Sequence, residues 1–386
     1  MPEIRIGLIG HKFMGRAHTH AYTDLPIFFK TDVKVVKKIL CATSEDVAEV
    51  AERWGWERSS RNWREVVESD EIDAVDISAP SAIHAEVAVY AARAGKHVFC
   101  EKPLALNVND AKRMVAAAEQ ARIVNMIGFN YRFVPAVALA KQLIDEGELG
   151  EIYHFRGIYQ QGWLTDPNYP LVWRLQKSAA GYGSLGDLGA HVIDLARYLV
   201  GEIDEVCAIS RTFVTERPKP AYVDGLVAVP GTERGRVDVD DATGFIASFR
   251  NKNTMGYFEM TRYGTGHCNQ NRIEINGSRG SLIFDMEQMN ELLFYSKSDT
   301  VRTHGFRRIQ VGEGVHPYMA NWWPAGHVIG YGDTFVNQAY EFISAIREGR
   351  KASPDFRDGL ICQQVLDAAA ESAEKKKWVK VNSEVI

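Results

Sequence analysis

The sequence contains few cysteines, and none of them belongs to a metal or redox motif. Five are scattered over 386 residues, at positions 41, 100, 207, 268 and 362, with no Cys-x-x-Cys pair. Sparse, unpaired cysteines are typical of proteins from a reducing compartment, so we expect a cytoplasmic protein. His18 and His20 form a His-x-His pair on a predicted helix, but they lack the spread of ligands that a zinc site needs, and we predict no metal.

Long apolar runs and an excess of positive charge are also missing. No run approaches the ~20 residues of a membrane-spanning helix, and we expect no signal peptide before the first strand. The net charge of −5 argues against nucleic acid or an anionic membrane as the main partner. The length predicts two domains rather than one, and 46% hydrophobic residues suffice for two sizeable cores.

The first domain, residues 1–128, alternates strand-like and helix-like patterns. Such alternation indicates right-handed βαβ units around a parallel, doubly wound sheet, which is a Rossmann-type α/β fold. The expected strands are 4–9, 35–42, 74–78, 97–101 and 124–128, and the expected helices are 15–25, 45–54, 82–94 and 108–120.

The second domain, residues 129–386, has short β-rich runs punctuated by glycine and asparagine, which are typical of an α+β fold with a large, mostly antiparallel open sheet. The Pro-, Gly- and charge-rich stretch 215–240 is predicted to be a surface loop. The two C-terminal helices are candidates to pack back on the first domain. The expected strands are 152–159, 206–213, 244–249, 254–260, 272–275 and 281–284, and the expected helices are 134–146, 188–200, 334–347 and 359–376.

The first strand leads into a glycine-containing turn that favours a dinucleotide. Gly10 and Gly15 occupy the outer positions of a G-x-G-x-x-G fingerprint, whereas Lys12 replaces the middle glycine. The first glycine permits the tight turn and the last lets the helix pack close to the strand. The lysine can contact a phosphate or point to solvent. We expect Gly10, Lys12, Phe13 and Met14 to line the cofactor.

The end of the second strand lacks the acidic residue that binds the ribose of NAD. Ala42 stands at that position, and no arginine follows it to bind the 2′-phosphate of NADP. Thr43 and Ser44 can hydrogen-bond ribose or phosphate, or simply cap the next helix. We favour NAD as the cofactor and keep NADP as the alternative.

Three side chains can move a proton on and off a hydroxyl. Lys102, within Glu101-Lys102-Pro103, follows a short apolar run at the carboxyl end of a predicted parallel strand, where open α/β sheets bind ligands. Asp187 and His191 lie four residues apart at the start of a predicted helix and therefore share one face. A dinucleotide fold before them would supply a hydride carrier.

Several motifs together resemble the Gfo/Idh/MocA family of sugar and cyclitol oxidoreductases, over essentially the whole chain. Their finer details resemble the levoglucosan dehydrogenase branch of that family. The family motifs are Asp76-Ile77-Ser78-Ala79-Pro80, His84, Glu101-Lys102-Pro103, Gly128-Phe129-Asn130-Tyr131-Arg132-Phe133 and Gly186-Asp187-Leu188-Gly189-Ala190-His191, and the branch details are Phe13-Met14-Gly15, Trp173-Arg174, Pro317-Tyr318, Trp322-Trp323-Pro324 and Gly330-Tyr331-Gly332.

The resemblance implies a Rossmann domain followed by a substrate domain whose open sheet commonly forms the contacts of a homo-oligomer, a tetramer or a dimer. It also implies that Lys102, Asp187 and His191 form the catalytic group. It places Pro80, His84 and Glu101 around the nicotinamide and its ribose, and we expect Ala79 and Lys102 to contact the cofactor as well.

The chemistry of these side chains fits the oxidation of a secondary alcohol. We expect His191 to take the hydroxyl proton, because an imidazole titrates near pH ~6.5. Asp187 would orient it or bind a neighbouring hydroxyl. Lys102 would hydrogen-bond the reacting oxygen and stabilise its alkoxide character.

The second domain supplies candidate sugar ligands, because sugars are bound by polar groups and by aromatic faces. The alternative is that these aromatic residues fill the core. Besides Lys102, Asp187 and His191, the candidates are Tyr131, Arg132, Tyr159, Trp163 and His327.

We therefore expect an NAD(P)-dependent dehydrogenase that oxidises a ring hydroxyl of a pyranose, an anhydrosugar or a cyclitol, with the levoglucosan-like details favouring C3. Two alternatives stay open. One is an NAD-dependent glycoside hydrolase that works through a transient 3-keto sugar, and the other is a non-catalytic NAD(P)-binding sensor.

Overall fold

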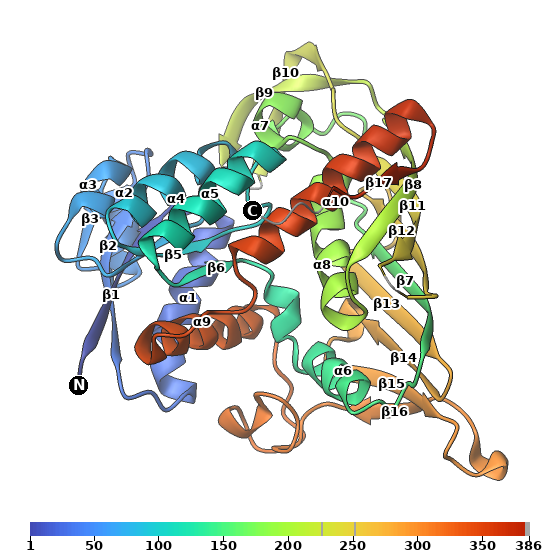
Figure 1. Ribbon diagram of the computed structural model, residues 1–386. Helices are drawn as coiled ribbons and strands as arrows, with labels where there is room; N and C mark the ends of the chain where they lie inside the picture. Colours follow the sequence, from blue (N-terminus) through green and yellow to red (C-terminus); the bar gives the residue numbers. More distant parts are fainter. Residues whose placement is uncertain (225–226, 251, 383–386) are drawn as a thin grey trace. The chain divides into compact units, whose positions relative to one another are not determined.

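The computed structural model describes residues 1–224, 227–250 and 252–382. The chain divides into two compact units (Figure 1). Within the described residues, the first unit comprises residues 1–130 and 331–363, and the second comprises residues 131–330 and 364–382. The second boundary falls inside one helix, α10 (Phe356–Lys375).

The first unit is built on a six-stranded parallel sheet in the order β3-β2-β1-β4-β5-β6. The short apolar runs form strands because both faces of the sheet are covered, and the side chains of β4 are fully buried. The strands are β1 (Glu3–Ile9), β2 (Lys34–Cys41), β3 (Arg58–Ser60), β4 (Ala74–Ile77), β5 (His97–Cys100) and β6 (Asn125–Ile127).

Helices cover both faces of this sheet. Figure 1 shows α4 and α5 together on one side, and α1 packed against α9 on the other. The Asn107 side chain caps α5 by accepting a hydrogen bond from the Asp110 amide. The helices of this unit are α1 (Phe13–Phe28), α2 (Val47–Arg53), α3 (Trp63–Glu68), η1 (Ser81–Ile83), α4 (His84–Arg93), α5 (Val108–Ala121), η2 (Asn130–Phe133), which continues into the second unit, and α9 (Tyr331–Glu348).

The second unit contains a nine-stranded mixed sheet in the order β16-β15-β14-β13-β7-β12-β11-β8-β17. The pair β7–β12 is parallel and every other pair is antiparallel. The strands are β7 (Ile152–Gln160), β8 (Ile203–Arg211), β11 (Ala242–Phe249), β12 (Met255–Thr261), β13 (Gln270–Gly277), β14 (Gly280–Asp285), β15 (Glu291–Ser296), β16 (Arg307–Gln310) and β17 (Val379–Lys380).

Helices pack on one face of this sheet. The helix α8 contacts β7, and α6 contacts β14 and β15. In the described part of the chain, no helix covers the opposite face (Figure 1), whose side chains are partly exposed. The helices of this unit are α6 (Pro135–Asp145), η3 (Trp173–Leu175), α7 (Lys177–Ala180), the π-helical turn η4 (Leu185–Gly189), α8 (Ala190–Leu199), η5 (Met286–Gln288), η6 (Val301–Thr303), η7 (Met319–Asn321) and most of α10.

The expected fold class is confirmed in both units. The structure adds β3 and α3 in the first unit and β15 and β16 in the second, which the sequence patterns did not indicate.

The prediction of a surface loop at 215–240 is wrong. Most of this stretch forms an antiparallel hairpin of β9 (Glu216–Asp224) and β10 (Val227–Arg236), although residues 225 and 226 lie outside the described residues. Backbone hydrogen bonds hold these two strands together, and most of their described side chains are exposed. The buried Arg217 anchors the base of the hairpin by donating hydrogen bonds to the carbonyls of Leu164, Asp166 and Tyr169.

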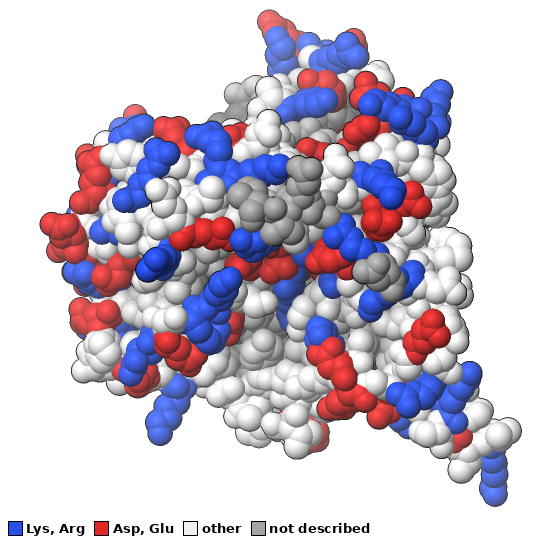
Figure 2. Space-filling view, viewed as in Figure 1, with Lys and Arg blue, Asp and Glu red and all other residues white. Residues whose placement is uncertain are grey.

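Two further observations concern the surface. Within the described residues, no helix combines the length and the apolar character needed to cross a bilayer. Acidic and basic side chains are interspersed on the face shown in Figure 2, in keeping with 45 basic and 50 acidic residues in the sequence.

Candidate active site

The turn after β1 has the geometry that its two glycines predict. Gly10 has a φ of +108°, and a Cβ there would lie 2.5 Å from the Ser78 carbonyl oxygen. A Cβ at Gly15 would lie 2.0 Å from the Gly10 carbonyl oxygen. Both positions therefore require glycine, so that α1 can start directly behind the turn. This close-packed strand–turn–helix fits a dinucleotide pyrophosphate.

Lys12, Phe13 and Met14 form the start of α1. Lys12 stands at the N-cap with its side chain about half exposed, and its Nζ lies 4.0 Å from the Asp46 carboxylate. Phe13 is 45% exposed, and its ring stacks on Tyr331 with centroids 6.3 Å apart. Met14 is half-buried.

A carboxylate lies near the glycine turn, although Ala42 occupies the position where an acid is expected. His11 Nε2 lies 3.0 Å from Asp46 Oδ1 and 3.0 Å from Ser44 Oγ. Hydrogen bonds from Ser44 and His11 lower the pKa of the Asp46 carboxyl. Asp46 is therefore ionised beside the turn, a feature that the sequence reasoning missed.

Thr43 is held from a neighbouring strand. Arg61, directly after β3, donates a hydrogen bond to the Thr43 carbonyl over 2.9 Å. The sequence offered no arginine directly after Ala42, but the parallel pairing of β2 and β3 brings Arg61 to this edge of the sheet.

The loops after β4 and β5 are joined by His84. Its Nε2 lies 2.9 Å from the Ala79 carbonyl oxygen and its Nδ1 lies 3.0 Å from the Pro103 carbonyl oxygen. Burial lowers the pKa of this imidazole. Since both ring nitrogens face protein carbonyls, His84 supports the loops carrying Ala79, Pro80 and Lys102.

Glu101 is buried beneath the half-buried Lys102. One carboxylate oxygen lies 3.0 Å from His18 Nε2, and the other accepts the Lys102 backbone N–H over 3.1 Å. The other ring nitrogen of His18 lies 2.7 Å from Asp76. His18 and Asp76 belong to this region, and neither was among the candidate site residues.

In the second unit, Asp240 holds the turn that precedes Asp187 and His191. Its carboxylate accepts the backbone N–H groups of Gly183 and Leu185, each over 2.8 Å. A Cβ at Gly183 would lie 1.8 Å from the Asp240 carbonyl oxygen. The turn continues into η4, which carries Asp187, and then into α8, which carries His191.

His191 is buried against a cluster of hydroxyl and amide groups. The Tyr131 ring lies 4.4 Å from the His191 ring, measured between centroids. The Tyr131 and Tyr159 hydroxyls are 2.7 Å apart, and Tyr159 donates to Asn269 Oδ1 over 2.7 Å. Burial raises the pKa of Tyr131.

The cluster continues towards Trp163. Gln161 donates to Asn269 Oδ1 over 2.8 Å and accepts a hydrogen bond from the Trp163 indole over 2.9 Å. We call Tyr131, Tyr159, Gln161, Trp163 and Asn269 the polar row. Asn269 was missed because it contacts residues more than 100 positions earlier.

A buried arginine adds charge to this unit. Arg262 is fully buried, and its guanidinium donates a hydrogen bond to the Asp240 carbonyl over 2.9 Å. Burial lowers the pKa of Arg262, while attraction to Asp187 and Asp240 opposes that shift. Asp187 therefore lies within the field of a cation that the sequence reasoning did not identify.

Arg132 binds a protein carboxylate. Its Nε and Nη2 donate to the two oxygens of Asp194, over 2.9 and 2.5 Å, and both side chains are buried. The guanidinium also lies 4.9 Å from the centre of the Tyr198 ring. Asp194 thus forms a buried ion pair with Arg132. This bidentate pair ties η2 to α8.

His327 lies in an exposed loop. Its Nδ1 is 2.8 Å from the Pro324 carbonyl oxygen, and Trp322 in the same segment is buried. The structure groups Tyr131, Tyr159 and Trp163 in the polar row, whereas His327 makes its contact within its own loop.

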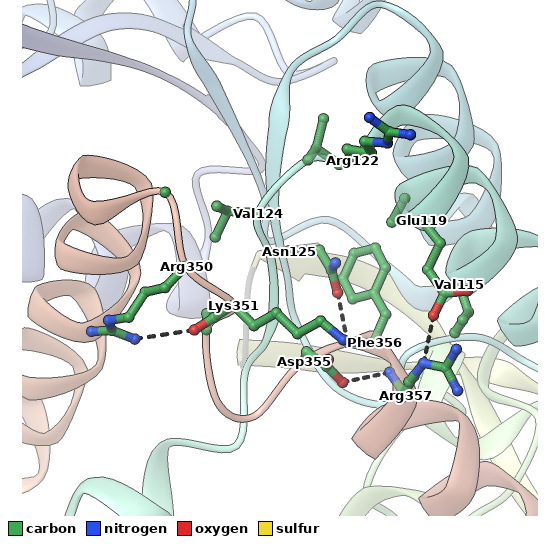
Figure 3. A pocket seen from close by; sticks show the side chains of 14 residues that line it. Val115, Glu119, Arg122, Val124, Asn125, Arg350, Lys351, Asp355, Phe356 and Arg357 are labelled. Atoms are coloured by element: carbon green, nitrogen blue, oxygen red, sulfur yellow. Dashed lines mark hydrogen bonds and ion pairs between the residues drawn. The ribbon is translucent and has the colours of Figure 1, made fainter.

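A hollow of about 390 Å³ lies elsewhere in the first unit, between α5, the C-terminal end of α9 and the start of α10 (Figure 3). Two of its arginines already bind carboxylates, because Arg357 pairs with Glu119 and Arg350 pairs with Glu341. Asn125 accepts the Phe356 backbone N–H over 2.8 Å. The contacts describe a structural junction, and we assign no ligand to it.

Each unit thus carries a candidate functional region of its own. The first unit brings the glycine turn, Ala79, Pro80, Glu101 and Lys102 to the carboxyl ends of β1, β4 and β5. The second unit brings His191 to the polar row. In the described part of the chain, no group of three His, Cys, Asp or Glu side chains could hold a metal ion.

The folds of both units agree with the family comparison. Residues 4–129 match the model of the oxidoreductase family with an NAD-binding Rossmann fold, and residues 137–283 match the GFO/IDH/MocA C-terminal domain. The chain therefore belongs to the Gfo/Idh/MocA family and is an oxidoreductase.

Individual relatives are similar over their full lengths. The chain is 45% identical to levoglucosan dehydrogenase of Pseudarthrobacter phenanthrenivorans, with 99% of each chain covered. It is 27% identical to myo-inositol 2-dehydrogenase of Thermotoga maritima, with 98% of each covered. A solved structure of levoglucosan dehydrogenase in complex with NADH and levoglucosan matches with 43% identity and a TM-score of 0.93, covering 98% of this chain and 99% of that one.

Proposed function

We propose that this protein is an NAD-dependent dehydrogenase that oxidises a secondary ring hydroxyl of an anhydrosugar or pyranose, with levoglucosan and its C3 hydroxyl as the first candidates. The observation that carries this proposal is the polar row beside the buried imidazole of His191. Hydroxyl and amide groups next to a potential base are what the recognition of a polyhydroxylated ring requires. The full-length similarity to levoglucosan dehydrogenase supports the same substrate class.

The first unit would hold the dinucleotide. The glycine turn would receive the pyrophosphate, with Lys12, Phe13 and Met14 beside it. Thr43 and Ser44 would lie towards the adenosine ribose, and Ala79, Pro80, Glu101 and Lys102 towards the nicotinamide. When bound, NAD accepts the hydride that leaves the carbon of the alcohol.

The protein's own groups handle the proton and the charge. His191 accepts the hydroxyl proton, and Lys102 hydrogen-bonds the same oxygen as negative charge develops on it. Asp187 orients the imidazole or binds the neighbouring hydroxyl. Tyr131 and Tyr159 position the ring, with Trp163, Arg132 and His327 as further predicted contributors.

Two wider features belong to this proposal. The uncovered face of the nine-stranded sheet presents apolar side chains on neighbouring strands, among them Ile209, Ile246 and Tyr257, and we propose that it forms the contact of a homo-oligomer, a tetramer or dimer. The cytoplasmic location inferred from the sparse cysteines stays a prediction.

The decisive experiment is a spectrophotometric screen at the absorbance band of reduced nicotinamide. Anhydrosugars, pyranoses and inositols are tested with NAD and with NADP, in the wild type and in Lys102→Ala and His191→Ala. We expect NADH formation with levoglucosan-like sugars and a loss of at least about 100-fold in kcat in both variants, with NADH binding retained. Wild-type kcat in both variants would contradict the assignment.

The same screen separates the alternatives. Release of an aglycone with solvent hydrogen exchange and no net NADH would favour the glycoside hydrolase. Cofactor binding without turnover of any sugar would favour the sensor.

A further inference from the structure

We propose that His18 is a positioning residue for Lys102. Held between Asp76 and Glu101, the His18 imidazolium fixes the Glu101 carboxylate, and that carboxylate fixes the backbone at Lys102. This inference rests on the proposed role of Lys102 in the dehydrogenase reaction.

The contacts of His18 define its charge state. Nδ1 lies 2.7 Å from Asp76 Oδ2, and Nε2 lies 3.0 Å from Glu101 Oε1. An ionised carboxylate only accepts hydrogen bonds. Both ring nitrogens must therefore donate, which makes the ring an imidazolium with one negative partner on each side.

Asp76 acts as a hydrogen-bond acceptor towards its other partners too, because each of them is a hydroxyl that donates to its carboxylate. The Tyr22 hydroxyl donates to Oδ2 over 2.8 Å, and the Ser78 hydroxyl donates to Oδ1 over 3.0 Å. Asp76 thus accepts three hydrogen bonds, from His18, Tyr22 and Ser78. It anchors the imidazolium from the side away from Lys102.

The surroundings of the ring keep it in place. His18 is 2% exposed, and the rings of Phe99 and Phe335 lie 4.8 and 5.6 Å from it, measured between centroids. Burial alone would lower the pKa of His18, but the two carboxylates prevail and raise it to about 10. The cation is therefore present throughout the neutral range.

Glu101 is confined on its remaining side by a glycine. A Cβ at Gly128 would lie 2.5 Å from Oε1 and 3.1 Å from Oε2. Gly128 leaves the space that the carboxylate fills, while His18 binds Oε1 and the Lys102 backbone N–H binds Oε2. The orientation of Glu101 is thus set from three directions, and one of these is the lysine segment itself.

Two substitutions of His18 separate the two sides of the ring. In His18→Asn the amide reaches the place of Nδ1, so it retains Asp76 and releases Glu101. In His18→Gln the longer amide reaches the place of Nε2 and retains Glu101. Gly128→Ala displaces the Glu101 carboxylate from the opposite side. Tyr22→Phe is the matched control, because it removes a hydrogen bond from Asp76 and leaves Glu101 untouched.

The first measurement is kcat at saturating NAD and sugar, with thermal unfolding as the check on folding. We expect kcat to fall on the order of 10- to 100-fold in His18→Asn and Gly128→Ala, since small displacements of a catalytic group cost this much. The KM for the sugar should change little. His18→Gln should recover about tenfold of the loss, and Tyr22→Phe should lower the melting temperature without lowering kcat.

The second measurement does not need turnover. Lysine amines are dimethylated with ¹³C-formaldehyde, the Lys102 signal is assigned by its absence in Lys102→Arg, and its pH titration is followed by NMR. We expect the titration midpoint to move in His18→Asn and Gly128→Ala and to stay in place in Tyr22→Phe.

The outcomes distinguish the inference from the proposed function. An unmoved Lys102 signal in His18→Asn and Gly128→Ala overturns the positioning role, as does a kcat loss that merely follows melting temperature across all four variants. A moved signal in a protein that oxidises no sugar leaves the positioning role in place and rejects the proposed dehydrogenase.

Discussion

Asp46 is the residue from which we expect discrimination between the two nicotinamide cofactors. Its carboxylate lies beside His11 and Lys12 at the glycine turn and would repel the 2′-phosphate of NADP. We predict that Asp46→Asn raises the ratio of kcat/KM for NADP to that for NAD about tenfold, which corresponds to about 1.4 kcal/mol. Steady-state kinetics with both cofactors measures this ratio.

Glu49→Gln is the control for this prediction, because it removes an exposed charge from the same helix, one turn further on. An unchanged ratio in Asp46→Asn, or an equal rise in Glu49→Gln, would show that Asp46 does not set the preference.

The raised pKa of His18 predicts how the free energy of unfolding depends on pH. Its pKa rises from an ordinary value near 6.5 to about 10 on folding, so the folded state binds one more proton than the unfolded state between these limits. The stabilisation is fully present below about pH 6.5 and is lost as the pH rises through about 10. We predict that the free energy of unfolding falls by up to about 1.4 kcal/mol per pH unit in this window.

Urea unfolding at several pH values between 7 and 9.5 tests this slope, with His18→Gln as the reference. Burial also raises the pKa values of the neighbouring Tyr22 and Cys100 well above their ordinary range, and these groups are common to both proteins. Equal slopes in the two proteins would mean that His18 takes up no proton on folding.

Some residues of the candidate site can be predicted from the sequence, and others cannot. Gly10, Lys102, Asp187 and His191 stand in motifs that are continuous in the chain, so they could be singled out directly. His18 was read only as part of a His-x-His pair, because its partners are 58 and 83 positions away.

Among the elements, the turn before η4 is the most constrained. Gly183 has no room for a side chain, because a Cβ would lie 1.8 Å from the backbone oxygen of Asp240. We predict that Gly183→Ala moves this turn, and with it Asp187 and His191, and lowers kcat by at least about 100-fold. It should also destabilise the protein by about 1–3 kcal/mol.

Kinetics and urea unfolding of Gly183→Ala test this prediction. Gly305→Ala is the matched control, because nothing lies within 4 Å of a Cβ at that position, and it should leave both quantities unchanged. Wild-type kcat in Gly183→Ala would mean that the turn does not position the two side chains.

The elements differ in how well the sequence predicts them. The longer strands and helices of the first unit follow from alternating apolar periods, whereas β3 has only three residues and α3 has six, too few for a period to emerge. The hairpin of β9 and β10 was missed because its composition is that of a loop and only backbone pairing makes it a sheet.

For the molecule as a whole, the uncovered face of the large sheet predicts self-association. Ile246 on β11 lies directly opposite Tyr257 on β12, and these side chains are 40% and 36% exposed. We predict that Ile246→Lys combined with Tyr257→Lys shifts the protein to a smaller species in light scattering coupled to size-exclusion chromatography, because charges at the centre of an apolar contact are strongly unfavourable.

Val301→Lys is the control, since this residue is 86% exposed in η6 and lies outside the sheet. A mass that stays the same in the sheet variant and in the wild type would exclude this face as the oligomer contact.

The imidazolium enclosed by Asp76, Glu101 and two phenylalanine rings has a practical consequence for spectroscopy. Its two ring protons, shielded from exchange and bound to carboxylates, should resonate far downfield of the amide envelope in a simple proton spectrum. These two proton signals could then be used to follow ligand binding beside Lys102 in protein that carries no isotope label.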